Sequence, residues 1–175
     1  MVKNKILILE NHRQTLVVIR SLAKAGYDPI VGYHNQIGEE FVLSSRYTKE
    51  TWFHPSVNEE QKFTEALVCL LKKRSDIACI FPLGEASSRA LAHNFDQISR
   101  FCGILMANPI AVETCLDKAL TYKLASELNV PFPETSVVTN FVDINAQIEK
   151  IGFPFILKPR TSCGSLYGKK CIICN

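Results

Sequence analysis

The C-terminal stretch, residues 152–175, reads GFPFILKPRTSCGSLYGKKCIICN. An apolar run ends at Lys158, a loop with small residues follows, and a second apolar run closes the chain. This pattern predicts two strands joined by a basic loop. Together with Lys150 the stretch carries five cations, and no acidic residue follows Glu149. We therefore expect an anionic ligand close to this part of the protein.

The loop of this stretch has two interpretations. Small residues free backbone N–H groups to surround phosphate oxygens, and Lys158 at the end of the strand supplies a compact positive charge. Alternatively, the loop is the solvated turn of an ordinary β-hairpin. The spacing is not that of a Walker A loop, because its glycines are too close together and no helix is predicted after them. The small residues in question include Ser162, Gly164, Ser165 and Gly168.

Cys171 and Cys174 have the CxxC spacing of redox and zinc sites. A second such pair and a nearby histidine are missing, and the two isoleucines between the cysteines are typical of a strand. We therefore interpret both cysteines as strand residues and predict no metal ligands in the chain. Seven cysteines without an export signal fit a reducing, cytoplasmic location.

Strands and helices alternate through residues 1–107, which we predict to be one domain. This alternation favours an α/β fold with a Rossmann-like open parallel sheet. In such a sheet, ligands bind at the carboxyl ends of the strands. His12, Arg13 and Glu85 follow predicted strands and are our candidate substrate-binding residues, although a solvated turn explains the first two equally well. The predicted strands are the apolar runs at 5–9, 27–33, 51–55 and 77–82.

Residues 108–175 are predicted to form a second, smaller unit. Asn108 and Asp117 are expected to cap its first two helices. A proline-punctuated segment, 130–139, is expected to lead into a strand. In the first unit, Asn11 is the predicted cap of the first helix, and Ser56 with Glu59 is a predicted capping box.

Several classes of function are excluded or disfavoured. No run of about 18 uncharged apolar residues is long enough for a membrane span. The first strand is followed by LENHRQTL, without the GxGxxG of a dinucleotide-binding domain. The third strand lacks the aspartate that a phosphate-accepting receiver domain requires. A net charge of only +3, with no basic-aromatic motif, disfavours nucleic acid as a partner.

Three groups of motifs resemble the opening of ATP-grasp ligases, the superfamily of carbamoyl-phosphate synthase large subunits and biotin carboxylases. They are CLDKALTYKLASELNVPFPETSVV, IGFPFILKPRTSCGSLYGKKCII, and the earlier segments ILILENHRQTLVVIRSLAKAGYDPIVGY and CIFPLGEASSRALA. The resemblance covers nearly the whole chain. It implies a pre-ATP-grasp domain followed by the first, incomplete α+β subdomain of an ATP-grasp fold.

The resemblance also implies ligands and roles. Lys118 and Lys158 match two lysines that touch ATP phosphates, and 161–168 matches a mobile glycine-rich loop, here with fewer glycines than usual. The complete enzyme would activate a small carboxylate as an acyl phosphate, which an amine or other nucleophile attacks. The magnesium ligands of such enzymes, a Glu and a Glu/Asn pair, lie further along than Asn175. We therefore expect the chain alone to bind ATP phosphates without catalysing ligation.

A non-catalytic α/β module that binds a small ligand or a partner is the alternative prediction. We also expect self-association, for example as a homodimer, because a partial second unit would leave sheet edges and apolar faces uncovered.

Overall fold

The computed structural model describes residues 4–34, 40–138, 140, 144–161 and 168–175. The chain divides into two compact units, Met1–Val112 and Glu113–Asn175. The division falls within helix α6 (Pro109–Leu116), whereas the sequence analysis placed the boundary just before this helix, at 107/108.

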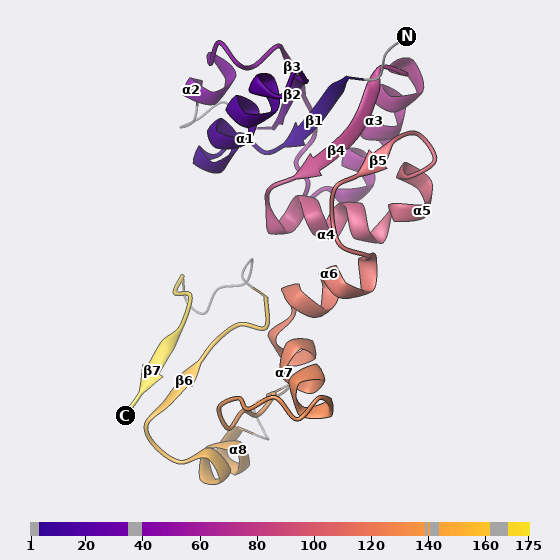
Figure 1. Cartoon of the computed structure of the whole chain (residues 1–175). Coiled ribbons are helices and arrows are strands. Elements are labelled where there is room, and N and C mark those ends of the chain that lie inside the picture. The colour runs from indigo at the N-terminus through magenta and orange to yellow at the C-terminus, as the bar shows by residue number, and fades with distance from the viewer. Residues whose placement is uncertain (1–3, 35–39, 139, 141–143, 162–167) are drawn as a thin grey trace. The chain divides into compact units, whose positions relative to one another are not determined.

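The first unit is built on a five-stranded sheet with the strand order β3-β2-β1-β4-β5 (Figure 1). Every pair of neighbouring strands is parallel. This is the open α/β sheet that the alternation of strands and helices predicted. The strands are β1 (Lys5–Leu9), β2 (Asp28–Tyr33), β3 (Glu50–Phe53), β4 (Ile77–Pro82) and β5 (Gly103–Ile104).

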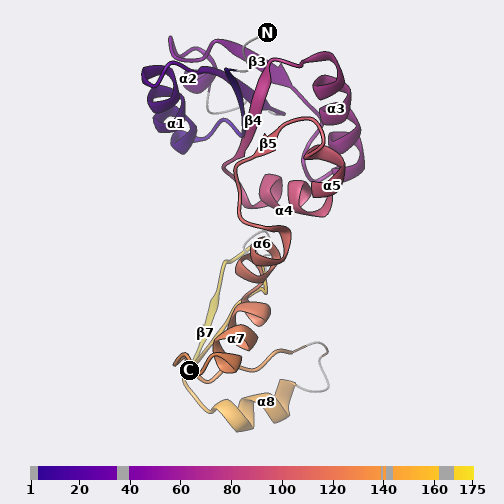
Figure 2. The ribbon, with the colours of Figure 1, turned by 45° about the vertical axis from the view of Figure 1, so that its right-hand side comes forward.

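Helices cover both faces of this sheet (Figure 2). Because side chains alternate along a strand, β1 contributes Leu7 and Leu9 to one core and Ile6 and Ile8 to the other. The first core includes residues of α3 (Glu60–Lys73), α4 (Glu85–His93) and α5 (Phe95–Ile98). The second includes residues of α1 (Arg13–Lys24) and α2 (Glu40–Leu43). A strand buried on both faces explains why β1 is a continuous apolar run.

The second unit contains α7 (Lys118–Glu127), α8 (Ile144–Ile151) and two strands, β6 (Phe155–Leu157) and β7 (Ile172–Cys174). The two strands are antiparallel, with Ile156 opposite Ile173. Gly152 follows α8 with φ +75°, the left-handed conformation that ends many helices. The proline-punctuated segment has no strand within 130–138, and the strand into which it was expected to lead falls on residues that lie mostly outside the described ones.

The capping predictions had different outcomes. Asp117 caps α7: its Oδ1 accepts hydrogen bonds from the backbone N–H of Ala119 and of Leu120. The caps predicted for the first unit are wrong, because α1 begins one residue later, with His12 at the cap position, and α3 begins at Glu60. Neither helix has a side-chain hydrogen bond at its cap. A pattern along the sequence locates a helix end only to within a few residues, which is enough to misassign a cap.

An ion-pair network connects the amino ends of three strands in the first unit. Arg74 donates to Asp76 from Nε (2.8 Å) and Nη2 (3.0 Å), and to Glu50 from Nη1 (2.8 Å). Lys5 Nζ contacts both Glu50 and Asp76. The Asp76 side chain is only 14% exposed, so its charge is stabilised mainly by these partners. The hydrogen bonds from Arg74, and then from Lys5, hold the pKa of the Asp76 carboxyl far below its ordinary value.

Asp76→Asn is expected to lower the free energy of unfolding at pH 7 by about 1–2 kcal/mol, because it removes a charge-assisted pair that is partly screened by solvent. The folded-state pKa of Asp76 lies below the unfolded one, so its contribution is present at neutral pH and is lost as the pH falls below about 4. The variant should therefore lose less stability on acidification than the unaltered protein. Urea unfolding followed by Trp52 fluorescence between pH 7 and pH 3 measures this. Asp96→Asn, at an exposed carboxylate of α5, is the control; equal acid sensitivity of the Asp76 variant and the unaltered protein would contradict the prediction.

Candidate functional site

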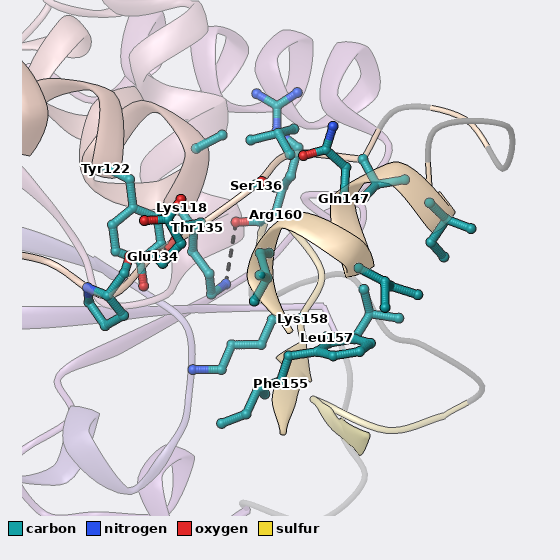
Figure 3. A pocket seen from close by; sticks show the side chains of 18 of the residues that line it. Lys118, Tyr122, Glu134, Thr135, Ser136, Gln147, Phe155, Leu157, Lys158 and Arg160 are labelled. Carbon is teal, nitrogen blue, oxygen red and sulfur yellow. Dashed lines mark hydrogen bonds between the residues drawn. The ribbon is translucent and has the colours of Figure 1, made fainter. Parts of the chain in front are cut away.

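A pocket of about 400 Å³ lies within the second unit (Figure 3). This volume is within the range of small-molecule sites. The walls come from the start of α7, the segment 133–138, helix α8, and the chain from Pro154 to Arg160. Apolar side chains of α8 and β6, including Ile148 and Phe155, form much of its lining.

Two lysines that are far apart in the sequence line this one pocket. Lys118 is the first residue of α7, and Lys158 directly follows β6. Lys118 Nζ donates to the backbone carbonyl oxygen of Arg160 at 3.3 Å, drawn as the dashed line in Figure 3. Lys158 Nζ has no hydrogen-bond or ion-pair partner among the residues that the structure describes, and its side chain is exposed. Two cations without a carboxylate partner in that part of the chain suit an anionic ligand.

The negative charge near the pocket is already paired. Glu134 is the one carboxylate among the described lining residues, and it lies 3.5 Å from Lys150 Nζ. Aromatic residues are close by as well, because the rings of Tyr122 and Phe132 stack with centroids 5.4 Å apart. The arrangement therefore combines positive charge with apolar and aromatic surface, as is common in small-molecule sites.

The start of α7 is joined to the chain after β6 by a pair that the sequence analysis did not identify. Arg160 Nη2 lies 2.5 Å from Asp117 Oδ2, and Arg160 Nε lies 3.2 Å from Asp117 Oδ1. The Asp117 side chain is only 14% exposed. The Arg160 guanidinium, and then the N–H groups of Ala119 and Leu120, hold the pKa of the Asp117 carboxyl below its ordinary value. The carboxyl group is therefore charged at neutral pH.

The predicted phosphate loop is only partly described. Ser162, Gly164 and Ser165 lie outside the described residues. Gly168 has φ +76°, a left-handed conformation that glycine adopts without strain, and it is not among the residues that line the pocket.

The three predicted substrate-binding residues of the first unit have different surroundings. His12 Nε2 lies 2.7 Å from Glu10 Oε2. Glu85 forms an (i, i+4) pair with Arg89 at 3.7 Å, and the Arg13 side chain is exposed. All three were predicted to lie at the carboxyl edge of the sheet. His12 is at the cap position of α1, which follows β1, and Arg13 and Glu85 are the first residues of α1 and of α4, which follows β4.

Glu10 and His54 also stand out at this edge, and neither was selected as a candidate substrate-binding residue. Glu10 has φ +89°, which is unusual for a residue with a side chain, and its carboxylate lies against Gly84, where an added Cβ would come within 1.9 Å of Oε1. His54 is 2% exposed, and its Nδ1–H donates to the carbonyl oxygen of Pro55 at 2.7 Å. Burial lowers the pKa of His54, so the ring is neutral. The signal in the sequence that could have identified His54 is its place directly after strand β3 and before Pro55.

Among the described residues, no group of three or more His, Cys, Asp or Glu side chains is placed to hold a metal ion. Cys171 and Cys174 are both free cysteines. Within the same part of the chain, every helix is too short or too polar to span a bilayer.

No protein-family model matches this chain. Over 54 residues, 31% of the chain, it is 37% identical to the bifunctional purine synthesis protein purC/E of Dictyostelium discoideum, of which the match covers 5%. Solved structures match over nearly the full length. The N5-carboxyaminoimidazole synthetase of Staphylococcus aureus, in complex with ADP, is 18% identical over 99% of this chain, with a TM-score of 0.74.

Two further structures are similar. The biotin carboxylase domain of 2-oxoglutarate carboxylase from Hydrogenobacter thermophilus is 18% identical over 99% of the chain, with a TM-score of 0.73. The L-amino acid ligase of Bacillus licheniformis is 12% identical over 92%, with a TM-score of 0.73. The chain spans 42%, 38% and 38% of these three proteins. All three are ATP-grasp enzymes, and this chain therefore has the fold of part of an ATP-grasp enzyme.

Proposed function

We propose that the pocket of the second unit binds the phosphates of ATP, and that the chain is part of an ATP-dependent ligase. The observation that carries this proposal is the placement of Lys118 and Lys158, from different segments, in one pocket without a carboxylate partner among the described residues. The ADP complex of the synthetase from Staphylococcus aureus supports it, because that protein shares the fold over 99% of this chain.

In the proposed reaction, a carboxylate oxygen of a small substrate attacks the γ-phosphorus of ATP and releases ADP. An amine or other nucleophile then attacks the acyl phosphate and displaces inorganic phosphate. Lys118 and Lys158 would neutralise phosphate charge, which is an electrostatic contribution and requires no proton transfer by either lysine. The small residues Ser162, Gly164, Ser165 and Gly168 are proposed to contribute backbone N–H groups to the same phosphates.

In this proposal, magnesium is only the ion bound to the ATP phosphates. Among the described residues, no group of three or more His, Cys, Asp or Glu side chains fits a metal ion, so no residue of that part of the chain is proposed as a magnesium ligand. Mg²⁺ commonly keeps several waters and is held through substrate phosphates with one or two carboxylates. Mg-ATP is therefore the ligand to test.

The substrate that receives the phosphoryl group, or the nucleophile that follows, is proposed to bind near His12, Arg13 and Glu85. The Glu10–His12 pair supports this assignment, because it places a largely buried carboxylate and an exposed imidazole at the carboxyl edge of the sheet.

Self-association as a homodimer remains part of the proposal. Its support is that the biotin carboxylase domain with the same fold is a dimer.

Titration of the full chain with Mg-ATP in a calorimeter is expected to give weak, saturable binding with a stoichiometry of one per chain. ADP should compete, because it retains phosphates for the two lysines to contact. Absence of binding at millimolar nucleotide would overturn the proposed function. The alternative, a non-catalytic module that binds a small ligand or a partner through the edge of the first unit, would then be favoured by the unusual backbone of Glu10.

A further inference from the structure

The pair between Asp117 and Arg160 occupies a defined position between the two lysines. Asp117 directly precedes Lys118, and Arg160 lies two residues after Lys158. The two ends of the Asp117 carboxylate accept separate hydrogen bonds from the Arg160 guanidinium, at 2.5 and 3.2 Å. An arginine held at two points is fixed in orientation as well as in distance.

The backbone reinforces this connection. The backbone N–H of Lys118 donates to the carbonyl oxygen of Arg160 at 3.0 Å, and Lys118 Nζ donates to the same oxygen at 3.3 Å. Arg160 alone is therefore hydrogen-bonded to the cap residue of α7, to the backbone N–H of its first residue and to the side chain of that residue. We call this set of contacts the 117–160 clasp.

We propose that the 117–160 clasp positions Lys118 relative to Lys158, so that the two ammonium groups meet the same polyphosphate. Asp117 and Arg160 are thus positioning residues, which act through the lysines and do not touch the ligand. This inference rests on the proposed nucleotide function.

The direction of the Arg160 side chain supports a positioning role. In Figure 3 its guanidinium points away from the ammonium groups of Lys118 and Lys158, while its carbonyl oxygen faces Lys118. The guanidinium charge is also compensated by Asp117, so it is less available to a phosphate than that of Lys158. A guanidinium that bound phosphate directly would have to leave its carboxylate partner first.

Asp117→Asn and Arg160→Gln separate these roles. Asparagine is as good a helix cap as aspartate, so Asp117→Asn retains the acceptor for Ala119 and Leu120 while it removes the charge that holds Arg160. Each variant is expected to weaken Mg-ATP binding by about fivefold, the upper range for a partly exposed ion pair. The double variant should lose no more than either single one, because both substitutions break the same contact.

Adenosine is the second probe, with binding measured by NMR titration on the full chain. Because the clasp acts on the phosphate-binding lysines, adenosine affinity should change by less than about twofold in every variant. Arg160→Lys keeps the charge but not the two-point geometry, so it should restore only part of the Mg-ATP affinity. Lys123→Ala is the matched control: it removes a cation of α7 that does not line the pocket, and both affinities should stay unchanged.

Several results would overturn the inference alone while leaving the proposed function standing. One is a loss with Arg160→Gln but none with Asp117→Asn, which would make Arg160 a direct phosphate ligand. Another is an equal loss of Mg-ATP and adenosine affinity, which would indicate general damage to the pocket. Unchanged Mg-ATP binding in both variants would also overturn the inference, because it would show that the clasp does not position Lys118. Failure of the unaltered chain to bind Mg-ATP would instead overturn the proposed function, and this inference with it.

Discussion

Lys158→Ala is expected to remove measurable Mg-ATP binding. The ammonium group lies at the pocket and has no partner within the described part of the chain, so its whole charge is available to a phosphate. A hydrogen bond between charged groups contributes about 1.5–3 kcal/mol, which corresponds to a loss of roughly 10- to 150-fold. Because the starting affinity is expected to be weak, such a loss takes binding out of calorimetric range.

Two controls distinguish the effect of a positive charge at position 158 from the effect of the protein's total charge. Lys123→Ala changes the net charge by the same amount, but the Lys123 side chain is 72% exposed, pairs with Glu127, and is not among the pocket's lining residues. Its Mg-ATP affinity should match that of the unaltered chain. Lys158→Arg preserves the charge and should retain detectable binding. Undiminished affinity of the Lys158→Ala protein would show that the nucleotide, if bound, lies elsewhere.

Phe63→Ala is expected to lower the free energy of unfolding of the first unit by about 3–5 kcal/mol. The Phe63 side chain is fully buried in the core between the sheet and helices α3–α5. Its ring lies 5.2 Å from that of His54 and 6.3 Å from that of Trp52, measured between centroids. Alanine would leave a cavity in this packed cluster. The free-energy cost of that cavity adds to the lost transfer free energy of the ring.

Urea unfolding followed by Trp52 fluorescence measures this loss directly, because the one tryptophan of the chain belongs to the same cluster. Phe53→Ala is the matched control. It makes the same chemical change on edge strand β3, where the Phe53 side chain is 63% exposed, and it should cost less than about 1 kcal/mol. Equal losses for the two variants would contradict the assignment of Phe63 to the core.

The first unit was predictable because its signals are local. Strand β1 is an uninterrupted apolar run, and a strand of that kind is typical of a parallel sheet with helices on both faces. Asp117 was also predictable, since a helix cap depends on residues within one turn. The caps of α1 and α3 were misplaced because neither helix has a side-chain hydrogen bond at its cap. The capping patterns in the sequence therefore did not mark the true helix starts.

The pairing of the two lysines was predictable only through resemblance. Lys158 was already a candidate from its place at the end of an apolar run before a basic loop, whereas Lys118 was selected because it matches a motif. No spacing rule in the sequence connects a helix start with the end of a distant strand. The structure places both in one pocket. Arg160 was counted as one cation of a basic stretch, whereas its carbonyl oxygen and guanidinium together connect that stretch to α7.

The sequence by itself determined the alternation of strands and helices in the first unit and the cap of α7, because each depends on neighbouring residues and on side-chain periodicity. Only the tertiary structure decided which distant groups meet. The Asp117–Arg160 pair, the shared pocket of two lysines and the burial of His54 all depend on contacts between segments far apart in the chain. Such contacts are set by packing and hydrogen-bond geometry in three dimensions, and periodicity along one segment does not encode them.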